Sequence, residues 1–503
     1  MGWLTTNTPP DDVLPRRQTF FAQYPTTTAS SERCDANPLP LTRFDVLPDD
    51  VILGIFTYYL SWKGSAWPTL VHVCQRWRNV VLESPGHLKL RLYCTRGKPV
   101  RRTLDIWPPL PVVVDHMNPP LWEVDNIVAA LECNDRVRDI DLKRVADPQL
   151  QIILAEMEVS FPTLTNLTLM SEHEMVPVVP DSFLKGSAPR LRYLVLSRIA
   201  FPGLPKLLLS ATNIVYLALD DIPHSGYISP EAMATCLSTL TRLISLSLGF
   251  QSPRPPPDQE SQRPPPPTRF VLPALTQFLF RGVSQYLEDL VARIDVPLVL
   301  KHWRLDFVFL PGHQLILDTP QLAQFLSRIP KLKTCKEVHV MLLHEMVAVR
   351  LYLPFSRLPR FFLTTTCKAL NQKLSFLAQV CRSSLSLLPS LEHLCIIDRS
   401  GVSQQQYPDD FENNQWLDIL RPFVATKNLY LSKETVPRIA PTLQLVGESL
   451  TAVLPSLQIL FLEKPYPSGP VGGIIGKFIS ARQLSGRPIV IRDWDGRPWS
   501  GQG

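Results

Sequence analysis

Two fragments of the sequence approach the patterns of catalytic histidine sites, and neither completes one. His344 and Glu345 begin the H-E-x-x-H pattern of zinc hydrolases, but Ala348 stands where the second histidine must be, so no zinc-binding pair forms on a helix face. The stretch SEHEM at 171–175 places a histidine between carboxylates, as a general base would be placed. It directly follows a predicted strand, and we interpret it as a solvent-facing turn.

Phosphate-binding and nucleophile patterns are incomplete as well. The stretch VGGIIGKF at 471–478 comes close to a phosphate-binding loop. Val471 occupies the position of the first glycine, however, and Phe478 replaces the serine or threonine that would bind magnesium, which favours an ordinary helix. No G-x-S-x-G or G-x-G-x-x-G sequence occurs. We therefore expect a protein that is not an enzyme and that has no catalytic residues, cofactor or metal site.

Composition and charge indicate a chain that can bury a core but that is built from short elements. The chain has 503 residues, a length that suggests ~2–4 domains. Of these residues, 45% are hydrophobic and 19% are charged, which argues against global disorder. The 50 prolines are about twice the average usage, so long helices and central strands are disfavoured. The net charge of +6 is mild and no four basic residues are consecutive, so we expect no nucleic-acid partner.

The cysteines and the amino-terminal segment indicate an intracellular protein. Nine cysteines are widely spaced without a C-x-x-C motif, unlike a disulfide scaffold or a zinc site. The start, MGWLTTNTPPDD, lacks the basic and apolar segments of a signal peptide, and its match to the myristoylation pattern at Gly2 is loose. The most apolar window, 204–219, is interrupted by Pro205, Lys206 and Asn213. We expect a soluble protein of the cytoplasm, the nucleus or both, with no membrane partner.

A pattern of the form L-x-x-L-x-L recurs from residue 137 onward. The copies are VRDIDL (137–142), LTNLTL (164–169), LRYLVL (191–196), IVYLAL (214–219), LISLSL (243–248), LTQFLF (275–280), LEHLCI (391–396), TKNLYL (426–431) and LQILFL (457–462), with weaker copies LKHWRL (300–305) and KEVHVM (336–341). Positions 4 and 6 have the spacing of a strand and point to one side of a sheet. One unit cannot bury its own leucines, so the units must stack and share one core.

The segments between these copies have the apolar spacing of helices, as in PEAMATCLSTLT (230–241) and TPQLAQFLSRIP (319–330). A strand and a helix repeated in this way resemble the leucine-rich repeat family, whose α/β fold is a solenoid curved into a horseshoe. The asparagine or cysteine that the family has after the last leucine is absent, because Val145, Ile199 and Ile222 stand at that place. We therefore expect an irregular α/β solenoid, and the pattern does not fix the repeat register between residues 300 and 390.

These features divide the chain into parts. The first residues are rich in Thr, Pro, Asp and Ser, and QSPRPPPDQESQRPPPPT interrupts the repeats; neither sequence can pack a core. The proline-rich interruption fits a ligand of an SH3 or WW module, or a tolerated loop insertion, which is the simpler interpretation. The predicted parts are a disordered arm (1–43), a small helical module (44–92), a proline-rich extended connector (93–130), the solenoid (131–495) with the insertion at 251–268, and a tail (496–503).

The helical module is predicted to contain two amphipathic helices. Pro48 suits a first helical turn, and the two aspartates after it lie at the positive end of the helix dipole. Two adjacent apolar rows follow, one of Val51, Ile55 and Tyr59 and the other of Ile52, Phe56 and Leu60. The second helix is predicted from Trp67 to the SPG sequence at 84–86. A module this small buries too little surface to be stable alone, so its apolar faces need a partner.

This module resembles the F-box family. The shared features are a Leu-Pro turn with an acidic residue, an apolar helix with Ile-Phe, and Val-Cys-x-x-Trp, present here in LPDDVILGIF (47–56) and VCQRWR (73–78). The spacer SWKGSAWP (61–68) departs from the family's usual acid-then-leucine sequence. The resemblance implies that the partner is the Skp adaptor, and through it a cullin, of a Skp–cullin–F-box ubiquitin ligase. The implied adaptor-binding residues are Leu47, Pro48, Val51, Ile52, Ile55, Phe56, Val73, Cys74, Trp77 and Val80.

Positions 3 and 5 of each copy are expected to line the concave side of the solenoid. They are Asn166 and Thr168, Tyr193 and Val195, Tyr216 and Ala218, Ser245 and Ser247, Gln277 and Leu279, His393 and Cys395, Asn428 and Tyr430, and Ile459 and Phe461. Such a mixed polar and aromatic surface suits protein binding, in which aromatic side chains often serve as anchors. The candidate client-binding residues are Tyr193, Tyr216, Tyr430 and Phe461.

Two functions therefore remain open. The resemblance implies a substrate-recognition subunit that docks the adaptor through residues 44–92 and holds an unidentified client protein on the solenoid. The alternative is a leucine-rich repeat scaffold outside any ligase, whose amino-terminal helices only cap the first repeat. An enzyme is a third class, and no paired titratable groups favour it.

Overall fold

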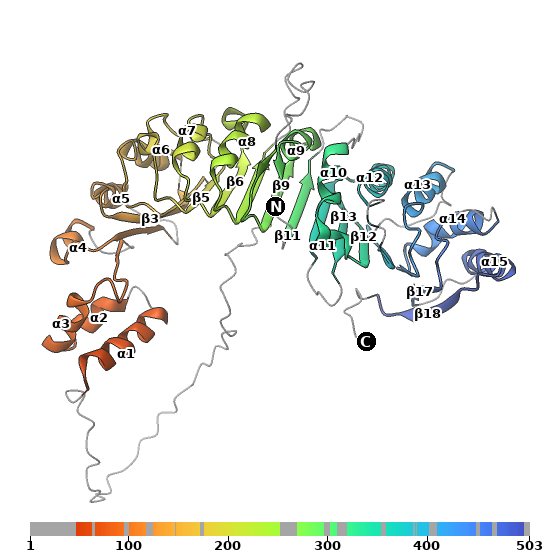
Figure 1. Ribbon diagram of the computed structural model, residues 1–503, viewed down its shortest axis with the longest axis horizontal. Helices are drawn as coiled ribbons and strands as arrows, with labels where there is room; N and C mark the ends of the chain where they lie inside the picture. The colour runs from red at the N-terminus through yellow and green to blue at the C-terminus, as the bar shows by residue number, and fades with distance from the viewer. Residues whose placement is uncertain are drawn as a thin grey trace, which may run out of the picture.

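The computed structural model describes most of the chain between residues 47 and 496 (Figure 1). The described residues are 47–62, 66–94, 100–116, 124–145, 147–171, 176–251, 269–295, 302–308, 319–353, 359–385, 388, 390–401, 410–448, 453–464 and 470–496. The predicted arm (1–43), the proline-rich residues 252–268, residues 172–175 of the SEHEM stretch and the tail beyond residue 496 lie outside them.

The described residues form an α/β fold around one large, mostly parallel sheet. Its sixteen strands lie in the order β1-β2-β3-β4-β5-β6-β7-β9-β11-β14-β13-β12-β15-β16-β17-β18. They are β1 (Leu92–Cys94), β2 (Val112–His116), β3 (Val137–Val145), β4 (Asn166–Ser171), β5 (Tyr193–Ser197), β6 (Tyr216–Ile222), β7 (Ser245–Phe250), β9 (Gln277–Gly282), β11 (His302–Phe307), β12 (Glu337–Leu343), β13 (Met346–Tyr352), β14 (Phe361–Thr366), β15 (His393–Arg399), β16 (Asn428–Leu431), β17 (Ile459–Glu463) and β18 (Val490–Trp494). A separate pair is formed by β8 (Phe270–Val271) and β10 (Ile294–Asp295).

Helices connect the strands and cover one face of this sheet, on the outside of the arc that the sheet describes (Figure 1). They are α4 (Val100–Ile106), α5 (Val124–Leu131), α6 (Asp147–Glu156), α7 (Leu204–Ser210), α8 (Pro230–Thr239), α9 (Ser284–Val291), α10 (Pro320–Ser327), α11 (Pro330–Lys333), α12 (Leu370–Ser383), α13 (Asp410–Leu420), α14 (Val436–Glu448) and α15 (Pro470–Leu484). The opposite face of the sheet, on the inside of the arc, is called the inner face below.

The repeated leucines explain why one face of the sheet is buried. Positions 4 and 6 are buried in every full copy of the pattern; Leu194 and Leu196, for example, are 0% and 3% exposed. Their side chains form one continuous core with the apolar sides of the helices. The residues at position 4 pair across neighbouring strands, as Leu167 does with Leu194 and Leu194 with Leu217. The predicted strand register is thus confirmed from β3 to β9.

Between residues 300 and 390, where the sequence pattern left the repeat register open, a hairpin is inserted into the sheet. After β11 the chain skips two places in the sheet, forms β12, and returns through β13 and β14 to pair with β11. Within the described sheet, β13 is the strand that runs antiparallel to both of its neighbours. The sequence did not indicate β13 or β14, because neither follows the L-x-x-L-x-L pattern. His344 and Glu345 lie in the turn between β12 and β13.

The predicted extended connector at 93–130 is wrong. These residues contain α4, β2 and α5, and β2 pairs with β1 on one side and β3 on the other. Val112 and Val114 are 0% exposed and belong to the main core. The sheet therefore begins at residue 92, and the prolines at 107–111 lie between α4 and β2 rather than in a spacer; residues 118–120 lie outside the described residues.

The predicted helical segments between strands are confirmed. PEAMATCLSTLT contains α8, TPQLAQFLSRIP contains α10, and VGGIIGKF lies within α15. Helix α8 begins after Ser229, whose Oγ accepts a hydrogen bond of 3.2 Å from the backbone N–H of Ala232, as an N-cap serine does. Of the helices in the described ranges, none is both long and apolar enough to cross a membrane.

The amino-terminal module contains three helices rather than two. They are α1 (Asp49–Trp62), α2 (Trp67–Val71) and α3 (Gln75–Glu83). The predicted second helix is broken because Cys74 is extended, with φ −156° and ψ 170°. The first amides of α3 then lack intrahelical partners, and the Cys74 thiol accepts a hydrogen bond of 3.5 Å from the N–H of Trp77. This break leaves Val73 58% exposed.

Candidate functional site

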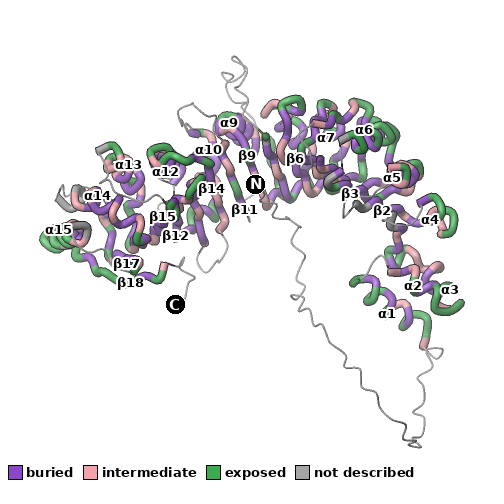
Figure 2. Tube along the Cα trace, turned by 180° about the vertical axis from the view of Figure 1, so that it is seen from behind, coloured by how far each residue is buried: buried purple, intermediate pink, exposed green. Residues whose placement is uncertain are grey.

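Helix α1 has one buried and one exposed apolar row. Ile52, Phe56 and Leu60 are 1%, 1% and 7% exposed. The neighbouring residues Val51, Ile55 and Tyr59 are 43%, 45% and 36% exposed, and the alternation along α1 can be followed in Figure 2. An amphipathic helix normally has a polar face opposite its buried face. Helix α1 instead keeps apolar side chains in solvent beside those that it buries.

Two exposed aromatic residues extend this surface. Tyr58 and Trp62 are 68% and 60% exposed, and their ring centroids lie 6.1 Å apart. They stand seven and eleven residues after Val51. The helical spacing that indicated Val51 and Ile55 therefore also places Tyr58 and Trp62 on the same side of the helix. Neither residue is among the ten predicted adaptor-binding residues. The term "α1 row" is used below for Val51, Ile55, Tyr58, Tyr59 and Trp62.

Contacts with α3 hold α1 in place. The rings of Phe56 and Trp77 meet edge to face, with centroids 4.8 Å apart and planes at 68°. Arg76 forms an ion pair of 2.7 Å with Asp49 and also donates a hydrogen bond to the carbonyl of Leu47. The Asp49 side chain is 66% exposed, so this ion pair contributes at most about 1 kcal/mol to stability. Burial of Phe56 therefore contributes more to holding α1 against α3 than this ion pair does.

The ten predicted adaptor-binding residues divide into three groups by exposure. Pro48, Val51, Ile55, Val73 and Cys74 are exposed, Leu47 and Trp77 are half-buried, and Ile52, Phe56 and Val80 are buried. The three buried residues pack in the interior of the module and support the α1 row from beneath. The accessible part of the predicted surface consists of the other seven residues.

The predicted lining residues of the inner face lie in two rows across the strands. Asn166, Tyr193, Tyr216, Ser245 and Gln277 are paired in one row, and Thr168, Val195, Ala218, Ser247 and Leu279 are paired in the next. On β15, β16 and β17 the corresponding rows are His393, Asn428 and Ile459, and Cys395, Tyr430 and Phe461. Sequence position thus located the side chains correctly, although it did not distinguish exposed from buried ones.

The four predicted client-binding residues form two separate aromatic pairs. Tyr193 and Tyr216 lie on neighbouring strands with centroids 6.2 Å apart and planes at 28°. Tyr430 and Phe461 stack more closely, with centroids 4.3 Å apart and planes at 8°. Tyr193 is 36% exposed, whereas Tyr430 is only 5% exposed. The pair on β5 and β6 can therefore contact a partner directly, whereas Tyr430 lies largely beneath its neighbours.

A pocket of about 780 Å³ opens beside the second pair. It is lined by His393, Asn428, Tyr430, Ile459, Phe461, Glu463, Lys464, Arg492, Asp493, Trp494 and Asp495. Trp494 meets Tyr430 edge on, with centroids 5.8 Å apart. Together with Met341, Cys395 and Ile397, these aromatic residues form a small apolar cluster separate from the main core. The sequence analysis missed Trp494, because β18 does not follow the repeat pattern.

Burial favours the neutral forms of Tyr430 and His393 in this pocket. Burial, and then the nearby Glu337 and Cys395, raise the pKa of Tyr430 to about 12. Burial is also the main reason why the pKa of His393 is lowered, although Glu337 and Glu392 oppose it. The pocket wall therefore offers an aromatic surface and a neutral imidazole near pH 7, with the charges of Glu463, Lys464 and Arg492 at its rim.

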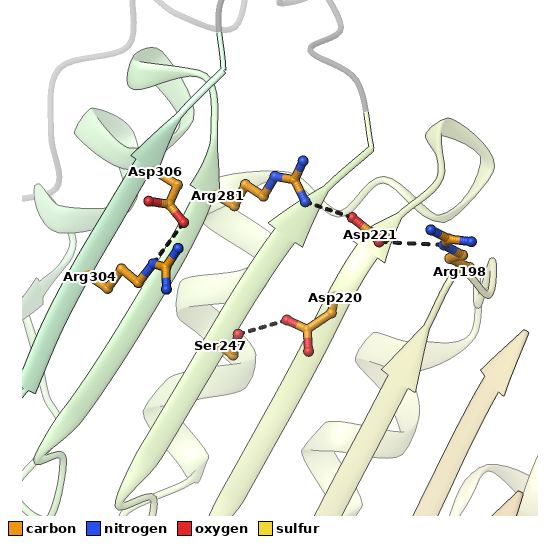
Figure 3. A network of polar contacts seen from close by, with 7 residues as sticks. All are labelled: Arg198, Asp220, Asp221, Ser247, Arg281, Arg304 and Asp306. Atoms are coloured by element: carbon orange, nitrogen blue, oxygen red, sulfur yellow. Dashed lines mark hydrogen bonds and ion pairs between the residues drawn. The ribbon is translucent and has the colours of Figure 1, made fainter. Parts of the chain in front are cut away.

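A polar network links the carboxyl ends of β5, β6, β7 and β9 (Figure 3). Asp221 bridges two guanidinium groups, at 3.5 Å from Arg198 and 3.2 Å from Arg281. Asp221 lies in an irregularity of β6 and has φ +51°, a left-handed conformation that suits a bulge. Gly249 of β7 lies between Asp221 and Arg281, and a Cβ there would be 3.3 Å from the Asp221 nitrogen. The absence of a side chain on β7 lets Arg281 reach across it.

The neighbouring acid of this network is held differently. Asp220 accepts a hydrogen bond of 2.7 Å from Ser247 on β7 (Figure 3). Burial raises the pKa of Asp220, and the adjacent Asp221 adds to that increase, while the Ser247 bond and Arg281 oppose it. Asp220 also contributes, after burial, to the raised pKa of Tyr216. The network therefore braces four strands and keeps Tyr216 un-ionised next to Tyr193.

Two comparisons with known proteins give no match. No protein-family model matches the chain, and no curated protein is significantly similar to it. Within the described ranges, no group of three or more His, Cys, Asp and Glu side chains is placed to hold a metal ion. Seven cysteines of these ranges, including the exposed Cys74, are free thiols. The function must therefore be argued from the residues and their geometry.

Proposed function

We propose that this chain is the substrate-recognition subunit of a Skp–cullin–F-box ubiquitin ligase. In this proposal residues 44–92 are the F-box, and the sheet with its helices is an irregular leucine-rich repeat solenoid. The F-box docks a Skp adaptor, and through it a cullin, while the inner face holds a client protein. The chain itself performs no chemical step, because ubiquitin transfer takes place on other subunits.

The α1 row is the single observation that carries this proposal. Five apolar or aromatic side chains of one helix are at least 36% exposed, immediately beside a row that is almost fully buried. Exposed apolar surface on a small helical module is typical of an interaction site. The α1 row also coincides with the LPDDVILGIF sequence that resembles the F-box, so the pattern of residues and their exposure favour the same surface.

The placement of the two surfaces supports separate roles for them. The α1 row lies on the helical module at the amino-terminal end of the arc, and the inner face follows the sheet along its length (Figure 1). A client on the inner face would be held near the adaptor by one chain. The benefit is effective concentration, because target lysines held close to the activated ubiquitin react more often than lysines that must diffuse to it.

Co-elution with a purified Skp-family adaptor tests the proposal. Val51→Asp combined with Ile55→Asp places two charges in the α1 row, and we expect complex formation to be lost. Both side chains are more than 40% exposed, so the fold should remain intact by circular dichroism. Ile152→Asp is a matched control, because Ile152 is 52% exposed on α6, away from the module. Leu47→Ala with Pro48→Ala tests the start of α1 in the same assay.

The alternative is a scaffold outside any ligase, in which the helices only cap the sheet. Its support is the contact of Trp67 with Trp107 and with the carbonyl of Arg91, which attaches the module to the first strands. A cap does not require the α1 row to be apolar on its solvent side. If the unmodified chain fails to bind any Skp-family adaptor, or if the charged double variant binds as well as the unmodified chain, the ligase proposal is wrong and the cap is favoured.

A further inference from the structure

Four consecutive strands of the sheet each place one arginine on the inner face. Arg281 belongs to β9, Arg304 to β11 and Arg350 to β13, and Arg360 directly precedes β14. Strand pairing puts β9, β11, β14 and β13 side by side in that order. With a strand spacing of about 4.8 Å, these guanidinium groups are spread over roughly 14 Å. They are called the arginine ladder below.

Phe362 organises the middle of the ladder. It is the strand partner of Arg304 on one side and of Arg350 on the other. The guanidinium carbons of Arg304 and Arg350 lie 5.2 Å and 4.8 Å from the centre of the Phe362 ring. Both distances are within the range of cation–π contacts, which orient a guanidinium group against the ring. Two of the four cations are thus positioned by an aromatic residue, without a carboxylate between them.

The arginines of the ladder differ in how their charge is balanced. Arg281 is balanced by Asp221 at 3.2 Å and Arg304 by Asp306 at 2.9 Å. Arg350, in contrast, forms no ion pair within the described part of the chain. Its side chain shares a hydrogen bond with Tyr352, which also lies near Glu337, and its buried Nε has no further hydrogen-bond partner there. The pKa of His302 is lowered mainly by burial, and the charges of Arg304 and Arg360 lower it further, as expected in a positive environment.

The hairpin that interrupts the repeats supplies half of this ladder. Strands β13 and β14 depart from the repeat pattern. Arg350 lies on β13, Arg360 directly precedes β14, and Phe362 lies on β14. The parallel strands β9 and β11 contribute the other two arginines, Arg281 and Arg304. The insertion thus concentrates positive charge at the centre of the inner face.

The two longest stretches outside the described residues, 1–46 and 252–268, do not provide a complementary charge. Residues 1–46 contain five acidic and four basic residues, and residues 252–268 contain two of each. Neither segment has the excess of carboxylates that four arginines would attract. A partner protein is therefore the better match for the surface by charge.

We propose that the arginine ladder binds an extended acidic segment of the client protein. This inference rests on the proposed function, because it assigns a chemistry to the client of the same inner face. An extended chain rises about 3.3 Å per residue, so roughly five residues span the ladder. Carboxylates distributed along such a segment can each accept from a separate guanidinium group. A single phosphate, in contrast, needs donors that converge on one point, and the arginines are distributed over four strands.

Fluorescence anisotropy with a labelled hexaglutamate peptide tests this inference on the purified full-length chain without adaptor. Arg304→Gln combined with Arg350→Gln removes the two cations that flank Phe362, and we expect the affinity to fall about tenfold. The control is Arg382→Gln combined with Arg421→Gln, which removes the same charge from exposed positions on the helix side. The control should change the affinity less than about twofold. Arg281→Gln with Arg304→Gln provides a second variant whose folding does not depend on Arg350.

Several outcomes would overturn the inference. Binding of hexaglutamine as tightly as hexaglutamate would do so, as would equal losses in the ladder and control variants. Displacement of hexaglutamate by an equal concentration of inorganic phosphate would indicate a convergent phosphate site instead. Displacement by a single-stranded oligonucleotide at lower concentration, with the same loss in the ladder variant, would indicate a nucleic-acid surface. Adaptor co-elution measured on the same ladder variant should be unchanged, so that failure here is distinguishable from failure of the proposed function.

Discussion

Trp67 joins the helical module to the first strands, and its replacement tests whether module and sheet form one cooperative unit. The side chain is 1% exposed. Its indole Nε1 donates a hydrogen bond of 2.7 Å to the carbonyl of Arg91, and its ring meets Trp107 edge to face at 4.7 Å. Arg91 in turn pairs with Asp139 of β3, which accepts a hydrogen bond of 3.0 Å from Thr165. The indole thus connects α2 to Arg91 and Trp107, and the Arg91 side chain continues this connection to β3.

Trp67→Phe retains an aromatic ring against Trp107 and removes only the N–H donor. The carbonyl of Arg91 is then left without this donor in a largely buried position, which costs about 1–3 kcal/mol. A loss of about 1–2 kcal/mol in the free energy of local opening accelerates amide exchange roughly 5–30-fold. Trp67→Ala also removes the buried ring, and should cost about 3–5 kcal/mol.

Hydrogen exchange read by mass spectrometry provides the measurement. We expect faster exchange in peptides that cover residues 84–94 and in β3, and not only in α2. Trp62→Phe is the control, because Trp62 is 60% exposed and belongs to the α1 row, away from these contacts. If exchange in β3 is unchanged by Trp67→Ala, the module opens independently of the sheet and the reasoning about a rigid connection is wrong.

Three further predictions concern the α1 row, a buried ion pair and the pocket. Ile55→Asp should change the free energy of urea unfolding by less than about 0.5 kcal/mol, because its side chain is 45% exposed; a larger loss would mean that the row is part of the core. Arg438→Met leaves the 1% exposed Asp398 without the guanidinium at 3.1 Å and should cost about 3–5 kcal/mol, so an unchanged melting temperature would contradict it. Tyr430 has its pKa raised from 10.0 to about 12, so the unfolded chain loses this proton first and stability should fall as pH rises from 10 to 12. Tyr430→Phe should remove that part of the alkaline destabilisation, as followed by urea unfolding against pH.

The repeat pattern predicted the regular part of the fold because its physical cause is local and recurrent. Each copy must place two apolar side chains on one side of a strand. The neighbouring copy must place its own two side chains on the same side and in the same strand register. Leu217 and Leu219 are buried for this reason, and so are Leu429 and Leu431 at the other end of the sheet. The same alternation places Tyr193 and Tyr216 on the inner face, where both were expected.

The parts that sequence reasoning missed lack that local signal. Strand β2 reads VVVDH and is paired with a strand on each side, so it shows a short apolar run rather than the repeat. Strands β13 and β14 are placed by a hairpin and a return to β11, which depend on pairing between residues far apart in the chain. The arginine ladder could not be predicted for the same reason, since its members come from segments that only this topology brings together.

The connection between the module and the sheet bears directly on the proposed role. A flexible linker would hold a client near the adaptor at an effective concentration that falls as the linker lengthens. It would not fix the orientation of the client relative to the adaptor. Here the chain after α3 passes through Leu88 and Leu90, which are 6% and 2% exposed, before it enters β1. A connection that is itself part of the core gives the α1 row and the inner face a fixed separation. In the ligase proposal, that fixed separation selects the lysines of the client that can reach the activated ubiquitin, because lysines outside this range are not brought closer by chain motion.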